Sequence, residues 1–107
     1  MNVEWSHERD REAVEKLARR NAVTERRMQR IVAARDFTDL QPRANGRAHF
    51  LEREYAGSFS IDLESKTRPA RLICEPIGDF KMKEGQYVRE TIKEFRVIKI
   101  EKDYHKK

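Results

Sequence analysis

The spacing of apolar residues changes once along the chain, and this change constrains the fold more than any other feature. In the first third, apolar side chains such as Val14, Leu17 and Ala18 recur every three or four positions, the period of an amphipathic helix. From His49 onward they recur at every second position, as in residues 59–63, the period of a half-buried strand. We therefore expect an α+β fold in which two helices precede a sheet.

The helical part predicts a hairpin of about residues 7–36. Its first helix spans residues 7–20 and opens with acidic side chains, which suit the positive end of a helix. Asn21 suits a left-handed position after that helix, and Thr24 suits the N-cap of a second helix. The apolar stripe of the second helix is formed by Met28, Ile31, Val32 and Ala34. Each helix has one apolar face, so the pair must cover another layer.

The second part of the chain predicts four strands, with residues 2–5 as an optional fifth. The main strands lie around residues 49–51, 59–63, 71–75 and 95–101, and Pro76 ends the third. Residues 77–92 are expected to form a mobile insertion or, at most, a short helix. The expected architecture is one domain, residues 1–107, with the hairpin on one face of a mainly antiparallel sheet of about residues 47–105.

The chain is short and highly charged. Its 107 residues suit a modest core and an open working surface rather than a large enclosed cavity. Lys and Arg number 24 against 19 Asp and Glu, and residues 77–107 alone carry 9 basic and 6 acidic side chains. This excess favours a polyanionic partner near the C-terminal end. Apolar runs are much shorter than the roughly 18 to 20 residues of a membrane span, so we expect a cytoplasmic protein without membrane contact.

Cysteine and histidine are too few to predict a metal site. The single cysteine, Cys74, lies in an apolar run and is expected to be a buried, unreactive thiol. The three histidines are scattered and show no metal-ligand spacing. We therefore expect neither a metal nor a cofactor.

A set of polar residues lies on or beside the expected strands. His49 stands at the start of the first main strand, Arg71 lies on the third, and the last is followed by Asp103, Tyr104 and His105. If the first and last strands end on the same side of the sheet, these side chains converge. Such a surface could cleave RNA, because histidine can deprotonate the 2′-hydroxyl and protonate the leaving 5′-oxygen, while arginine stabilises the phosphorane-like transition state.

Each of these residues also has a purely structural interpretation. A single histidine near a strand start is most often an ordinary surface residue, and residues near a chain end are often frayed. Arg71 could pair with Asp62 or Glu64 on the neighbouring strand. A solvated helix face explains a further group better than an RNA-binding stripe does, namely Arg19, Arg20, Arg26, Arg27 and Arg30. Spacing alone leaves the function open.

Three stretches of the sequence form a recognisable combination. They are residues 57–63, residues 71–76 and residues 97–105, the last of which closes with Asp-Tyr-His. Together with the two N-terminal helices they resemble, in order and over essentially the whole chain, the HigB-type toxins of the RelE/ParE superfamily, also called plasmid maintenance system killer proteins. The resemblance implies a RelE-like fold and a ribosome-dependent mRNA endonuclease, the toxin of a type II toxin-antitoxin pair.

The resemblance also implies roles for individual residues. His49 matches the family's catalytic histidine, Arg71 matches the basic residue that stabilises the scissile phosphate, and the C-terminal catalytic cluster corresponds to Asp103, Tyr104 and His105. The expected RNA- and ribosome-binding residues are Arg47, Arg53, Lys99, Lys102, Lys106 and Lys107. The implied partners are the ribosome with its mRNA and a HigA-type antitoxin with a helix-turn-helix, through which alone the pair would bind operator DNA.

The sequence departs from the family at one position of the expected site. Related toxins commonly carry a lysine three residues after the histidine, where this chain has Glu52, followed by Arg53. A carboxylate facing the scissile phosphate would oppose transition-state charge, so either Arg53 or Arg47 replaces the lysine or the activity is weaker than usual. Two alternatives to a nuclease therefore stay open: a non-catalytic toxin of the gyrase-directed branch, and an antitoxin-binding member with a degenerate site.

Overall fold

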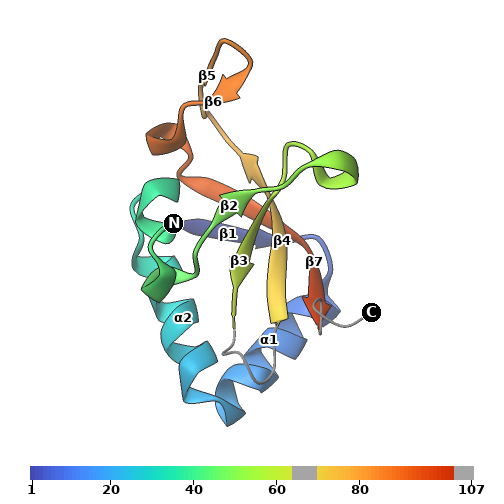
Figure 1. Cartoon of the computed structure of the whole chain (residues 1–107). Coiled ribbons are helices and arrows are strands. Elements are labelled where there is room, and N and C mark those ends of the chain that lie inside the picture. The colour runs from blue at the N-terminus through green and yellow to red at the C-terminus, as the bar shows by residue number, and fades with distance from the viewer. Residues whose placement is uncertain (64–69, 103–107) are drawn as a thin grey trace.

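The computed structural model describes residues 1–63 and 70–102 (Figure 1). It contains two helices, α1 (Glu8–Arg20) and α2 (Ala22–Ala33). A five-stranded sheet has the order β1-β7-β4-β3-β2. Its strands are β1 (Asn2–Trp5), β2 (His49–Phe50), β3 (Phe59–Asp62), β4 (Ala70–Ile77) and β7 (Glu94–Lys102), and a separate hairpin consists of β5 (Met82–Lys83) and β6 (Gln86–Tyr87).

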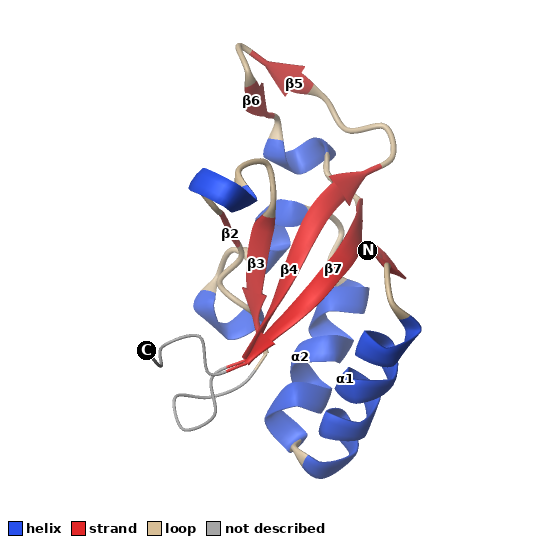
Figure 2. Cartoon of the chain, turned by 90° about the vertical axis from the view of Figure 1, so that its right-hand side faces the viewer, coloured by secondary structure: helices blue, strands red, loops and turns tan. Residues whose placement is uncertain are grey.

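The two helices pack against one face of the sheet, and the core lies between these layers (Figure 2). Val14 of α1 and Ile31 of α2 belong to the same buried cluster as the inward side chains of the central strands, which include Phe59, Ile61, Leu72, Cys74, Phe95 and Val97. All neighbouring strands are antiparallel except β1, which runs parallel to β7. The expected α+β architecture is therefore confirmed, including the optional strand at residues 2–5.

The turn between α1 and α2 differs from the prediction in the residue that caps the second helix. Asn21 has an extended backbone, with φ −134° and ψ 108°, and its side chain accepts hydrogen bonds from the amides of Val23 and Thr24. Asn21 is thus the N-cap of α2, and Thr24 is an interior residue of that helix. Both residue types cap helices well, so the sequence alone could not rank them. Val32, expected in the apolar stripe, is 63% exposed.

Thr24 gives rise to a stability prediction. Its side chain is fully buried, and its Oγ1 has no hydrogen-bond partner within residues 1–63 and 70–102. A buried hydroxyl without a partner costs about 1 to 3 kcal/mol, so we expect Thr24→Val to raise the free energy of unfolding by about 1 kcal/mol. Urea denaturation would measure this. Thr38→Val is the control, because the Thr38 hydroxyl bonds Asp36 in an exposed turn; a gain there as large as at Thr24 would contradict the explanation.

One further prediction for the strands was wrong, and another was incomplete. Pro76 does not end the third strand but pairs with Phe95, inside β4. The pairing of β3 with β4 ends at Cys74. The backbone nitrogen of Pro76, which has no N–H, therefore faces the side of β4 on which β3 no longer pairs. The region of residues 77–92 holds a short 3-10 helix, η4 (Arg89–Thr91), but also the β5–β6 hairpin, which was not predicted and which projects away from the sheet (Figure 1).

Two expectations from the sequence concern the single thiol and the length of the apolar segments. Cys74 is buried, as predicted, and burial raises the pKa of its thiol well above the usual range. Among the residues that the structure describes, no helix combines the length and the apolar character needed to cross a bilayer.

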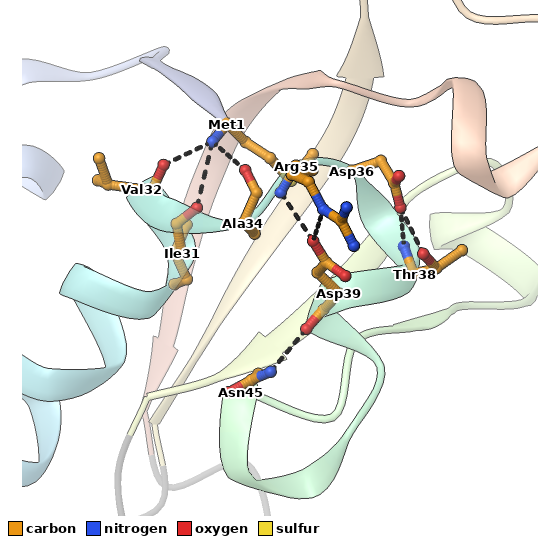
Figure 3. A network of polar contacts seen from close by, with 9 residues as sticks. All are labelled: Met1, Ile31, Val32, Ala34, Arg35, Asp36, Thr38, Asp39 and Asn45. Atoms are coloured by element: carbon orange, nitrogen blue, oxygen red, sulfur yellow. Dashed lines mark hydrogen bonds and ion pairs between the residues drawn. The ribbon is translucent and has the colours of Figure 1, made fainter.

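A polar network connects the end of α2 to the segment that leads into β2 (Figure 3). The α-amino group of Met1 donates to the carbonyls of Ile31, Val32 and Ala34, at 3.4, 2.7 and 2.6 Å, and so satisfies groups that a helix C-terminus leaves unpaired. Asp39 accepts from the backbone amide of Arg35 at 2.9 Å, and this bond lowers the pKa of the Asp39 carboxyl.

The same network continues to the next turn. The Asn45 side chain donates to the Asp39 carbonyl at 2.8 Å. Phe37 and Leu40 of the 3-10 helix η1 (Phe37–Leu40) are fully buried beneath it. A second 3-10 turn, η2 (Arg43–Asn45), follows η1 and leads towards His49. The path of the chain into β2 is therefore held by the core and by specific hydrogen bonds.

Candidate functional site

The face of the sheet opposite the helices carries most of the chemically versatile side chains. Cross-strand partners share a face, and one row runs from His49 to Ser60, Ile73 and Lys99. The next row runs from Asp62 to Arg71 and Glu101. We call these two rows the open face; they alternate with the core residues along each strand.

His49 is an exposed side chain with a defined orientation. Its Nδ1 lies 3.0 Å from the carbonyl oxygen of Arg47, and its Nε2 lies 3.4 Å from Oγ of Ser60. A carbonyl only accepts hydrogen bonds, so Nδ1 carries the proton in this contact. In the neutral imidazole Nε2 is then the basic nitrogen, and the Ser60 hydroxyl donates to it. This arrangement suits a general base.

Arg71 lies where the sequence predicted it, on the third main strand, but its charge is engaged. Its Nε and NH2 both donate to Oε1 of Glu101, at 2.9 and 2.6 Å, and its side chain is only 19% exposed. The sequence interpretation named Asp62 or Glu64 as the carboxylate partner; the structure adds Glu101 on β7, while Asp62 lies opposite Arg71 on β3 and Glu64 lies outside the described residues. A phosphate approaching this site would meet a guanidinium already held by a carboxylate.

Lys99 forms the other end of the first row. Its Nζ donates to the phenol oxygen of Tyr55 at 3.0 Å and lies 5.5 Å from the centre of the Tyr55 ring. The hydrogen bond to Tyr55 is the main cause that raises the pKa of the Lys99 ammonium, so the group stays cationic. Tyr55 belongs to the 3-10 turn η3 (Arg53–Tyr55) between β2 and β3, so this turn reaches across the open face to β7.

The position of the turn η3 over the open face is consistent with the burial of two open-face residues. Ser60 and Ile73 lie on this face, yet both are fully buried. Ile73 is not part of the core cluster between the helices and the sheet. Because Ser60 is inaccessible, its hydroxyl can orient His49 but cannot attack a substrate.

The remaining sequence candidates lie in several places. Arg47 pairs with Asp62, Nε to Oδ2 3.2 Å, beside the His49 row. Arg53 is exposed with a left-handed φ of 60°. Lys102 is exposed and pairs in register with Ala70, which places it on the helix side of β7. Five predicted residues lie outside the described part of the chain: Asp103, Tyr104, His105, Lys106 and Lys107.

Comparison with known proteins identifies no relative. Models of protein families, curated proteins and solved structures all give no match. The chemistry of this chain must therefore be argued from its own residues.

Sequence reasoning missed two residues that bond cations of the open face: Glu101, which bonds Arg71, and Tyr55, which bonds Lys99. Glu101 could have been found, because it alternates with Lys99 on one strand and so shares its face. Tyr55 gave no such signal, since it lies in a turn 44 positions away from Lys99. Within residues 1–63 and 70–102 no group of three His, Cys, Asp or Glu side chains is arranged to hold a metal ion.

Proposed function

We propose that this chain is an RNA endonuclease that cuts mRNA on the ribosome, as the toxin of a type II toxin-antitoxin pair with a RelE-like fold. The observation that carries the proposal is the exposed His49 imidazole, oriented by the Arg47 carbonyl at 3.0 Å on the sheet face that also holds Lys99 and Arg71. Cleavage by the RNA's own 2′-hydroxyl requires a base and cationic charge, and this face of the sheet carries both, with His49 on β2 and Lys99 on β7.

The proposed reaction proceeds as follows. The Ser60 hydroxyl first turns away from Nε2 of His49, which then accepts the proton of the 2′-hydroxyl, whose oxygen attacks the adjacent phosphorus. The bond from phosphorus to the 5′-oxygen breaks, and His105 supplies the proton that this oxygen needs. The products are a 2′,3′-cyclic phosphate and a 5′-hydroxyl. Lys99, whose ammonium group donates to the Tyr55 hydroxyl, stabilises the negative charge of the transition state.

The other roles follow from the resemblance stated for the sequence. Tyr104 orients the substrate and Asp103 orients His105 or binds ribosomal groups, while Arg71 contributes charge at the phosphate. The residues proposed to bind RNA and the ribosome are Arg47, Arg53, Lys102, Lys106 and Lys107. The ribosome positions the message, which an open sheet face cannot enclose. We also propose that its partner is a HigA-type antitoxin and that its location is cytoplasmic.

Mapping message ends tests this function. The purified chain is added to ribosomes translating a defined mRNA, and the 5′ ends of the products are determined. We expect cuts at fixed positions within codons, and none when the same mRNA is incubated without ribosomes. An intact message on translating ribosomes would refute the proposal.

One observation favours a second candidate, a toxin that binds its target without chemistry. The guanidinium of Arg71 is held at 2.6 Å by Glu101, which offsets the charge that a phosphate would need. For this candidate, expression arrests growth while the mRNA stays intact and DNA is damaged. No effect on growth would instead support a degenerate antitoxin-binding member.

A further inference from the structure

A cavity of about 300 Å³ lies between the β5–β6 hairpin and the turn that precedes β3. It is lined by Phe50, Gly57, Gly85, Gln86, Tyr87 and Arg89. Its volume lies at the lower end of the roughly 300 to 1,000 Å³ of small-molecule sites. None of these residues belongs to the open face described above. The size suits one planar group rather than an extended ligand.

The wall of the cavity is a rigid stack of aromatic rings. The Phe50 ring stacks on Phe37 with centroids 4.6 Å apart and on Tyr87 with centroids 4.9 Å apart, and both pairs are nearly parallel. The Tyr87 hydroxyl donates to the Gly57 carbonyl at 2.9 Å and so ties the hairpin to the turn. Phe37 is fully buried, which anchors the stack in the core.

Arg89 is the polar group that this wall presents. Its guanidinium carbon lies 5.6 Å from the centre of the Phe50 ring and 6.0 Å from that of Phe37. Arg89 is exposed, and within the described residues its guanidinium forms no ion pair or hydrogen bond. Three arginines of the main sheet and the segment before it differ from Arg89, because Arg47, Arg71 and Arg96 are each paired with a carboxylate.

The remaining lining residues favour a flat, hydrogen-bonding ligand. Gly57 and Gly85 carry no side chain, and a Cβ at Gly85 would meet nothing within 4 Å, so a ring can approach the backbone closely. The Gln86 amide both donates and accepts hydrogen bonds. A nucleobase combines a planar face with such an edge, and single-stranded RNA is commonly bound by stacking bases on aromatic rings and guanidinium planes.

We propose that this cavity binds one nucleobase of single-stranded RNA, stacked on the guanidinium of Arg89. The inference rests on the proposed nuclease function and names the place of a base that flanks the cleaved phosphate. Phe50 directly follows His49 on β2, an outer strand of the sheet, and consecutive strand residues point to opposite faces. An RNA strand that passes this edge can reach both His49 and the cavity.

Binding measurements without cleavage test the proposal. The probe is a short fluorescently labelled single-stranded RNA, offered intact and with single abasic positions, and binding is followed by anisotropy. Loss of a stacked base costs about 1 to 3 kcal/mol, so we expect Arg89→Ala to weaken binding by about 5- to 150-fold. An abasic substitution at one position should weaken wild-type binding similarly and should not weaken the variant further.

Arg26→Ala is the matched control, because Arg26 is an exposed arginine on α2 and its loss changes the net charge equally. Equal losses of affinity in the two variants, indifference of the wild type to every abasic position, or no binding at all would overturn the inference. Base-dependent binding without message cleavage would leave the cavity standing and refute the nuclease. Cleavage without base-dependent binding would support the nuclease and refute the cavity as a base-binding site.

Discussion

Replacing Gly46 with alanine is expected to destabilise the protein by about 2 to 5 kcal/mol. Gly46 has a φ of +118°, which side chains rarely adopt, and a Cβ there would lie 2.5 Å from Cγ2 of the buried Ile61. Its carbonyl also accepts the Asp62 amide at 2.8 Å, so the backbone cannot move away without loss of that bond. Urea denaturation with circular dichroism measures the change in the free energy of unfolding.

Gly85→Ala separates the clash from the backbone strain. Gly85 has a φ of +77°, but its Cβ would lie in open space. In this variant only the strain of a left-handed backbone lowers the stability, by about 1 to 2 kcal/mol. If both variants lost the same stability, the close contact between Gly46 and Ile61 would not be the cause.

Replacing His49 with alanine is expected to lower the rate of message cleavage by about 10²- to 10⁴-fold, the usual contribution of a general base. His49 is exposed on the two-residue strand β2, so the fold should tolerate the change. Single-turnover cleavage on translating ribosomes measures the rate, and circular dichroism verifies folding.

His7→Ala is the matched control for that experiment. His7 is an exposed histidine that precedes α1, and its side chain makes no capping hydrogen bond. We expect this variant to cleave at the wild-type rate. Equal rates for the His49 and His7 variants would remove His49 from the mechanism, and a loss in both would point to a general effect on stability.

The sequence predicted the layers of this fold because each layer has its own apolar period. A period near 3.6 predicted α1 and α2, and a period of two predicted β3, β4 and β7. The β5–β6 hairpin escaped prediction because its strands have two residues each, too few to show a period. Its position depends on Tyr87 and Phe50, which meet only in the folded chain.

The candidate site was less predictable than the fold, because its contacts join distant parts of the chain. His49 and Arg71 were named from residue type and position, yet the carboxylate that holds Arg71 lies 30 positions away. Tyr55 meets Lys99 only because η3 reaches over the sheet. Residue type therefore suggested which side chains matter, while the state of each charge required the structure.

Cleavage of a message with a single 2′-deoxynucleotide at the mapped cut tests the central claim most directly. The proposed reaction requires the 2′-hydroxyl of that nucleotide as the attacking group, with His49 as its base. We predict that the all-ribose message is cut on the ribosome to leave a 2′,3′-cyclic phosphate and a 5′-hydroxyl. The deoxy-substituted message should stay intact at that position, and cutting there at the same rate would contradict the account.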